Sequence, residues 1–231
     1  MTTNTTIATL DSTGAVPAYV AKPAGTPRGV IIVIQEIFGV NPGIVKKADD
    51  WAGAGYLSVA PDIFWRQKPG IELDPDVPEQ FQQAIDYMMK HDFERGLEDL
   101  KAVLAWARVQ GAGKVGLVGF CMGGKIAYEV ASATDIDAAV GYYGVAIDTM
   151  LDRAASITGQ LLLHIPTADG FVSPEAQKAM HDGLDGNAHV TLYDYEGLDH
   201  GFADTFGARR NEVGAQLADS RTAAFFTKYV G

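Results

Sequence analysis

Short, nearly continuous apolar runs recur along this chain, and longer segments of mixed polarity separate them. The run at 29–35 shows no polar alternation, which is typical of a strand buried on both faces of a parallel sheet. Comparable runs predict strands at 56–60, 114–118, 138–143, 161–165 and 190–195. The segments between them predict helices at 42–54, 79–90, 93–109, 175–184 and 211–229.

The order of these elements predicts the fold class. Two β-type runs, 5–10 and 16–21, flank a turn cluster, so an N-terminal antiparallel hairpin is expected. Strands then alternate with helices, which indicates one α/β domain over residues 1–231, with a mostly parallel, doubly wound sheet and helices on both faces. Ligands of such sheets bind at the carboxyl ends of the strands, which directs attention to Glu36, Cys121, Tyr143, Asp169 and His200.

A cysteine lies at the junction of a predicted strand and a helical pattern, in Gly119-Phe120-Cys121-Met122-Gly123-Gly124. Gly-x-Cys-x-Gly predicts a nucleophile elbow, a sharp turn that exposes the nucleophile in front of the N–H groups and dipole of the following helix. Gly119 and Gly123 would let the strand and helix backbones approach closely, because any Cβ there would obstruct them. The alternative is that Cys121 is a small buried hydrophobic residue.

Two other strand ends supply partners for a thiol nucleophile. The α/β-hydrolase fold arranges nucleophile, acid and histidine in this order along the chain, and Cys121, Asp169 and His200 follow that order. Asp169 would hold the imidazole tautomer, and His200 would act first as base and then as acid. The competing acids are Asp185, Asp194 and Asp199, and His200 could be an ordinary loop histidine. We predict an α/β-hydrolase fold with a Cys-His-Asp triad.

Composition restricts the partners and the compartment. The 231 residues are 47% hydrophobic and 20% charged, which is typical of a folded domain. A net charge of −11 disfavours nucleic acid and anionic membranes as partners. The single cysteine favours a reducing compartment, and neither a signal peptide nor a membrane-spanning run is evident. We therefore expect a cytoplasmic monomer or small homo-oligomer that acts on a small molecule.

The chain resembles the dienelactone hydrolase family, the carboxymethylenebutenolidases, from about residue 29 to the C-terminus. The matching segments are Gln35-Glu36-Ile37-Phe38-Gly39, the cysteine elbow, Gly141-Tyr142-Tyr143-Gly144, Asp169 with Phe171-Val172, and His200-Gly201-Phe202. The resemblance implies hydrolysis of a lactone or small ester through a thioester acyl-enzyme, without a cofactor. No metal is expected either, because the histidines and the cysteine show no metal-ligand spacing.

The resemblance also implies a role for Glu36, which would interact with the resting thiol and take up its proton when substrate binds. A partly buried carboxyl group beside a thiol has a raised pKa, so this proton uptake is chemically reasonable. The residues alone leave open that Glu36 is a strand-end carboxylate satisfied by backbone N–H groups. Met122 and Ile37 are the expected oxyanion donors through their backbone N–H groups.

The substrate-binding positions depart from the family pattern. The family binds a substrate carboxylate with two arginines, one near the start of the helix at 79 and one four residues after the histidine. This chain has no arginine from 67 to 94, and Asp204 occupies the second place. An aspartate there would repel a carboxylate and favour a neutral or cationic substrate. Arg66 does match a family position, and Arg209 or Arg210 could reach the mouth of the site.

Candidates for the pocket wall are the aromatic residues Phe38, Trp65, Tyr142, Tyr143 and Phe171, although each could also be a core residue. Two alternative functions stay open at this point. One is a related esterase or thioesterase that acts on a neutral substrate. The other is a non-catalytic, redox-responsive protein of the same fold that uses Cys121 as a reversible oxidation site.

Overall fold

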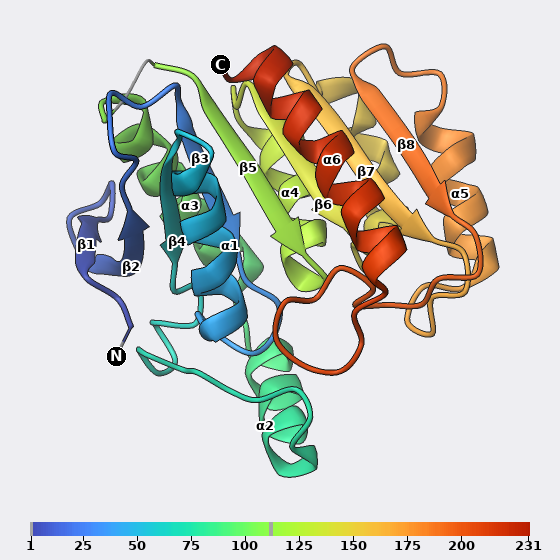
Figure 1. Ribbon diagram of the computed structural model, residues 1–231, viewed down its shortest axis with the longest axis horizontal. Helices are drawn as coiled ribbons and strands as arrows, with labels where there is room; N and C mark the ends of the chain where they lie inside the picture. Colours follow the sequence, from blue (N-terminus) through green and yellow to red (C-terminus); the bar gives the residue numbers. More distant parts are fainter. Residues whose placement is uncertain (1, 111–112) are drawn as a thin grey trace.

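A mixed eight-stranded sheet forms the centre of the molecule in a computed structural model that describes residues 2–110 and 113–231 (Figure 1). The strand order is β1-β2-β4-β3-β5-β6-β7-β8. β4, β3, β5, β6, β7 and β8 run parallel to one another, whereas β2 is antiparallel to both β1 and β4. The strands span Thr5–Ala8 (β1), Ala15–Ala21 (β2), Val30–Ile34 (β3), Leu57–Pro61 (β4), Val115–Phe120 (β5), Ala138–Tyr142 (β6), Gln160–Pro166 (β7) and Val190–Tyr195 (β8).

Helices cover both faces of this sheet, so the predicted doubly wound α/β architecture and its N-terminal hairpin are confirmed. One face packs against α1 and α6, and the other against α3, α4, α5 and the 3-10 helix η1. Only η1 has no counterpart among the predicted elements. The helices span Pro42–Gly53 (α1), Pro78–Met89 (α2), Phe93–Arg108 (α3), Met122–Ala133 (α4), Ile147–Ser156 (η1), Pro174–Leu184 (α5) and Glu212–Tyr229 (α6).

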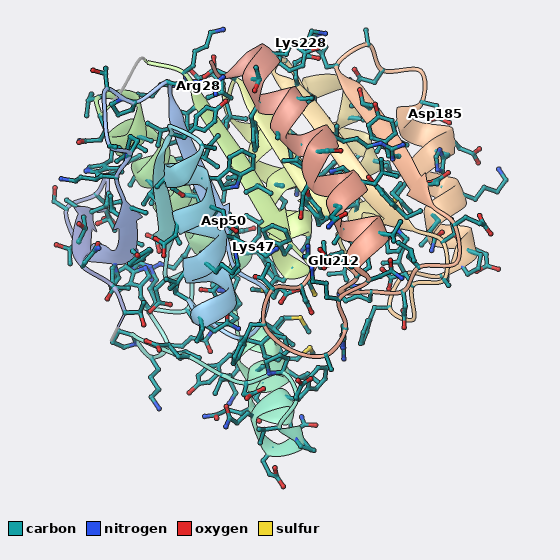
Figure 2. The ribbon with its side chains drawn as sticks, viewed as in Figure 1. Arg28, Lys47, Asp50, Asp185, Glu212 and Lys228 are labelled. Atoms are coloured by element: carbon teal, nitrogen blue, oxygen red, sulfur yellow. The ribbon has the colours of Figure 1, made fainter. Side chains whose placement is uncertain are left out.

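The continuous apolar runs are explained by the layers on either side of the sheet. Every residue of β3, β4, β5 and β6 is buried, because side chains on both faces of these strands pack against helices. Charged side chains such as Asp185 and Lys228 lie at the periphery of the molecule, whereas Lys47 of α1 is buried (Figure 2). No helix in the described ranges has the length and apolar character to cross a membrane.

Four α-helices begin with a side-chain cap, whereas α2 and α4 do not. Asn41, Asp92, Ser173 and Asn211 cap α1, α3, α5 and α6, each accepting a hydrogen bond from a backbone N–H of the first turn. The N-cap of α4 is Cys121, whose side chain makes no capping hydrogen bond. The α4 N-terminus therefore keeps backbone donors and the positive end of its dipole at the carboxyl edge of the sheet.

The elbow depends on a close approach of β5 and α4 that only glycine allows. A Cβ at Gly119 would lie 1.9 Å from the carbonyl oxygen of Gly123, and a Cβ at Gly123 would lie 2.6 Å from the carbonyl oxygen of Gln35. Both distances are far inside van der Waals contact, and the opposing atoms belong to the backbone. The predicted role of these two glycines is thus confirmed.

Gly119→Ala should destabilise the protein by at least about 2 kcal/mol, because a backbone segment must move to admit the methyl group. Gly53→Ala is the matched control, since a Cβ at Gly53 meets nothing within 4 Å. That control should change stability by less than about 1 kcal/mol. Urea denaturation measures both free energies of unfolding. Equal stability of the Gly119→Ala variant and the wild type would contradict the close-approach explanation.

Candidate active site

Cys121 occupies a strained backbone position between β5 and α4. Its φ of 54° and ψ of −113° lie in a region that residues with side chains rarely adopt. Its N–H donates to the carbonyl of Tyr142 at 3.0 Å, and its carbonyl accepts from the N–H of Gly124 at 2.9 Å. This turn brings the sulfur to the carboxyl edge of the sheet, where it is half-buried and lines a cavity.

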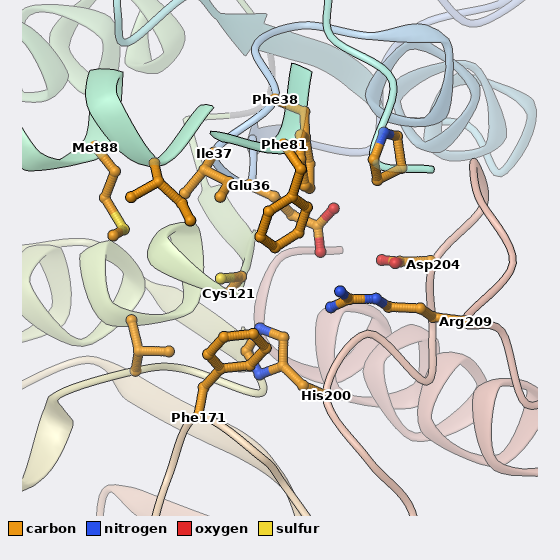
Figure 3. Close-up of a pocket in the computed structure, with 13 residues that line it drawn as sticks. Glu36, Ile37, Phe38, Phe81, Met88, Cys121, Phe171, His200, Asp204 and Arg209 are labelled. Carbon is orange, nitrogen blue, oxygen red and sulfur yellow. The ribbon is translucent and has the colours of Figure 1, made fainter. Parts of the chain in front are cut away.

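Asp169 and His200 meet at the same edge, from the loops after β7 and β8. The Nδ1 atom of His200 lies 2.9 Å from Oδ2 and 3.1 Å from Oδ1 of Asp169, and both side chains are buried. A carboxylate is an acceptor only, so Nδ1 carries the imidazole proton and Nε2 is left with a lone pair. Nε2 is buried without a hydrogen-bond partner among the described residues, and the histidine lines the same cavity as Cys121 (Figure 3).

The competing carboxylates have other partners. Asp199 accepts from the backbone N–H groups of Gly170 and His200, at 2.9 and 2.7 Å, and so fixes the loop that carries the histidine. Asp185 and Asp194 both contact the surface imidazole of His181. The geometry therefore favours Asp169 over these three as the partner of the His200 ring.

Burial dominates the chemistry of the thiol. It raises the pKa of Cys121 well above the ordinary value, and the nearby Glu36 carboxyl raises it further. The backbone N–H of Met122 acts in the opposite direction through a hydrogen bond to the sulfur, which lowers the pKa by a smaller amount. The pKa of Cys121 is therefore shifted in the direction that favours the thiol over the thiolate.

Glu36 lies directly after β3 and lines the cavity beside Cys121. Burial raises its pKa well above the ordinary value, and the charge of Asp204 and a hydrogen bond with Asp204 add to this effect. Tyr143 and Lys47 lie close enough to act on the Glu36 carboxyl group, and both lower its pKa. Glu36 is therefore part of a side-chain network, in contrast to the alternative of a carboxylate held by backbone N–H groups.

The cavity has a volume of about 260 Å³, and its walls are largely apolar. Three wall residues, Phe81, Ile85 and Met88, come from one side of α2, which lies beyond the carboxyl ends of the parallel strands (Figure 1). The complete lining is Glu36, Ile37, Phe38, Pro75, Phe81, Ile85, Met88, Cys121, Val145, Phe171, His200, Asp204 and Arg209.

The substrate-binding candidates divide into three groups. Phe38, Phe171 and Asp204 line the cavity, and Asp204 faces Glu36 within it (Figure 3). Tyr143 lies behind the wall, where its hydroxyl donates to Oδ1 of Asp204 at 3.0 Å and its ring packs 4.9 Å from that of His200. The prediction that Arg66 binds substrate is wrong. Its side chain lies outside the cavity and forms a two-point ion pair with Asp99 at 2.8 and 2.7 Å.

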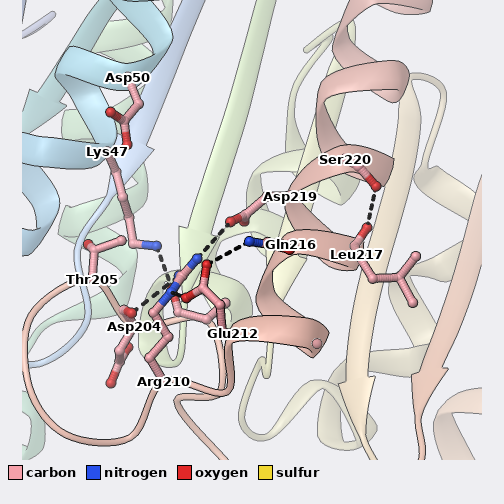
Figure 4. Close-up of polar contacts among 12 residues, drawn as sticks. Lys47, Asp50, Asp204, Thr205, Arg210, Glu212, Gln216, Leu217, Asp219 and Ser220 are labelled. Carbon is pink, nitrogen blue, oxygen red and sulfur yellow. Dashed lines mark hydrogen bonds and ion pairs between the residues drawn. The ribbon is translucent and has the colours of Figure 1, made fainter.

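Of the two loop arginines, Arg209 lines the cavity and Arg210 does not. The guanidinium of Arg209 lies over the rings of Phe81 and Phe171, at 5.4 and 5.9 Å. Arg210 instead pairs with Glu212 at 2.7 Å and with Asp219 at 3.7 Å on the side of α6 (Figure 4). Of these two arginines, it is therefore Arg209 whose side chain lines the cavity that contains the thiol.

Sequence reasoning missed the α2 wall and Lys47. Phe81, Ile85 and Met88 recur at helical spacing, so this apolar stripe was a usable signal, but it could equally have faced the core. Lys47 gave no signal, because a lysine in an amphipathic helix is normally exposed. Its Nζ donates to the carbonyl of Ala203 at 2.8 Å, next to Asp204, and burial lowers its pKa. Within the described ranges, no group of three or more acidic, histidine or cysteine side chains could hold a metal ion.

Comparison with known proteins identifies what the chain is similar to. The model of the dienelactone hydrolase family matches residues 16–230. A protein of Azospirillum brasilense assigned as a carboxymethylenebutenolidase is 40% identical over 222 residues, which cover 94% of this chain and 95% of that protein. The carboxymethylenebutenolidase of Pseudomonas putida is 37% identical and covers 90% of this chain and 89% of its own. A Klebsiella pneumoniae structure assigned to the dienelactone hydrolases has a TM-score of 0.81 at 29% identity, covering 98% of this chain and 100% of its own.

The raised pKa of Cys121 predicts a slow resting thiol. At pH 7, iodoacetamide should alkylate the folded protein at least about tenfold more slowly than the same protein unfolded in guanidinium chloride. The folded rate should still be rising with pH above 9, because the thiolate fraction grows only near the raised pKa. Mass spectrometry follows the single cysteine in both states. Folded protein that reacts at pH 7 as fast as unfolded protein would contradict a protonated resting thiol.

Proposed function

This chain belongs to the dienelactone hydrolase family and is a carboxylic ester hydrolase, and we propose that it cleaves a lactone or small ester through a thioester on Cys121. One observation carries the proposal. The unpartnered Nε2 of a buried, Asp169-oriented His200 and the sulfur of a strained elbow line one cavity. A nucleophile, a base and a group that orients the base are what thiol catalysis requires.

In the first half of the reaction, the thiol proton passes to a carboxyl group at Glu36 when substrate fills the cavity. The thiolate attacks the carbonyl carbon, and the tetrahedral oxyanion accepts hydrogen bonds from the N–H groups of Met122 and Ile37. When the intermediate collapses, the C–O bond of the ester breaks and the S–C bond of the thioester remains. The carboxyl group at Glu36 passes the thiol proton to the leaving oxygen and so returns to its starting state.

In the second half, Nε2 of His200 removes a proton from water, and the oxygen attacks the thioester carbonyl. The C–S bond breaks, the acid product forms, and the sulfur regains a proton from the imidazolium. Asp169 keeps the lone pair on Nε2 and stabilises the imidazolium while it carries two protons. The net change is the addition of one water molecule across the ester bond.

The cavity supports an uncharged substrate. Its walls from α2 and from Phe38 and Phe171 are apolar, so they suit a hydrocarbon or aryl group. Glu36 and Asp204 are the acidic side chains that line the cavity beside the thiol, and Arg209 lines it as well. A carboxylate on the substrate would meet at least one negative charge beside the sulfur, and the single guanidinium is already required to offset it.

Substitution of the proposed triad should abolish most of the activity. Cys121→Ala and His200→Gln should each lower kcat by at least about a thousandfold on a p-nitrophenyl ester, because each removes a reacting group. His181→Gln is the matched control, since it removes a histidine that contacts only surface carboxylates, and it should stay within about twofold of wild type. Thermal melting verifies that all three variants fold. Substantial turnover by folded Cys121→Ala would exclude the cysteine as nucleophile.

A pair of esters tests the substrate charge. Wild type should favour p-nitrophenyl butyrate over mono-p-nitrophenyl succinate by at least about tenfold in kcat/KM, which corresponds to about 1.4 kcal/mol. The rates with hydroxide alone correct for the intrinsic reactivity of each ester. Arg209→Gln should widen the preference because it removes the cation of the cavity, and Arg210→Gln should not change it. Faster turnover of the succinate ester by wild type would overturn the uncharged-substrate proposal.

A further inference from the structure

Two carboxyl groups from distant parts of the chain meet beside the thiol. Glu36 follows β3, and Asp204 lies four residues after His200 in the loop after β8. Both line the cavity, and their carboxyl groups face one another in Figure 3. Asp204 adds to the raised pKa of Glu36, and only 5% of Asp204 is exposed. Such a contact between two acidic side chains demands an explanation in terms of charge.

The hydrogen-bonding capacity of these groups supplies the explanation. An ionised carboxylate can only accept hydrogen bonds, so two ionised carboxylates cannot bond to each other. Tyr143 has a single O–H, and that O–H donates to Oδ1 of Asp204 at 3.0 Å. Two ionised carboxylates that face each other in a largely apolar cavity repel, and one carboxyl proton held in common removes that repulsion.

The cations around the pair are engaged elsewhere. Lys47 of α1 donates from Nζ to the carbonyl of Ala203 and lies 3.9 Å from the centre of the Phe120 ring. Arg209 lies over the rings of Phe81 and Phe171. Among the described residues, no salt bridge joins either cation to Glu36 or Asp204. Lys47 acts on the charge of both carboxyl groups, but neither cation forms a salt bridge with the pair.

The other groups that face the pair are Arg210, whose Nη1 lies 3.4 Å from the backbone carbonyl of Asp204, and the Cys121 thiol and His200 imidazole across the cavity. Burial raises the pKa of Glu36 well above its ordinary value, and Asp204 raises it further. The direction of this pKa shift agrees with the position of the two carboxyl groups, which face each other. A raised carboxyl pKa means that the proton stays bound at neutral pH and leaves only as the pH rises through that higher value.

We propose that Glu36 and Asp204 hold one proton in common in the resting enzyme, and that Asp204 is the positioning residue that sets the charge on Glu36. The catalytic consequence rests on the proposed function of Cys121. A singly protonated pair carries one negative charge, so it has one remaining position that can accept the thiol proton. The acceptor for that proton is then the pair as a unit, in place of Glu36 alone.

Infrared difference spectroscopy of the whole enzyme tests this directly, because a protonated carboxyl group has a C=O stretch that an ionised one lacks. At pH 7, wild type should show a carboxyl band that is lost in Asp204→Asn and in Glu36→Gln. Asp219→Asn is the matched control, since Asp219 also accepts from a tyrosine hydroxyl at 3.0 Å, on Tyr142 outside the cavity. That variant should keep the band. Subtracting variant from wild type removes the contributions of Asp62 and Glu129, whose pKa values burial also raises.

A pH titration of the same band adds a second readout. Its midpoint in wild type should lie above the ordinary range for carboxyl groups, and Asp204→Asn should move the Glu36 midpoint down by about one pH unit or more. The proposal is overturned if wild type has no such band at pH 7, or if a folded Asp204→Asn protein and Glu36→Gln both retain it. No substrate is present, so the outcome does not depend on whether Cys121 is the nucleophile. A failure of the triad proposal would leave this band unchanged.

Discussion

The left-handed backbone of Cys121 is the constraint on which the site depends. A residue with a side chain at φ 54° is strained by about 1–3 kcal/mol, so the surrounding structure must hold it there. The close backbone contacts at Gly119 and Gly123, and the hydrogen bond to the Tyr142 carbonyl, do so. In return, the turn places the sulfur at the N-terminus of α4 and in the cavity that Glu36 and His200 also line.

Burial then determines the charge state of the groups that gather at this edge. It raises the pKa of the Cys121 thiol and of Glu36, and it lowers the pKa of Lys47, so each is shifted toward its neutral form. The neutral form of the thiol must lose a proton before it can act as the proposed nucleophile. In the mechanism proposed above, Glu36 and Asp204 take up that proton and the oriented imidazole of His200 activates water.

The sequence predicted those features that depend on local pattern or on strand ends. Apolar runs in β3 and β5 indicate strands buried on both faces, and the elbow glycines indicate backbones that approach closely. The strands and the elbow could therefore be recognised without coordinates. Asp169 and His200 could be paired because parallel strands end at one edge of the sheet. Arg66 was misplaced because a matching position does not reveal that Asp99, 33 residues later, holds its guanidinium. The Glu36–Asp204 contact, the α2 wall and buried Lys47 depend on how loops and helices pack, which one-dimensional spacing does not record.

The central claim is that the acyl group passes through the sulfur of Cys121. Rapid acid quench during turnover of a p-nitrophenyl ester, followed by intact-mass and peptide analysis, tests it most directly. The account predicts one acyl group on the peptide that contains Cys121, removed by hydroxylamine as a thioester would be. An acyl group on a serine or threonine peptide, or steady turnover with no acylated protein at any quench time, would contradict it.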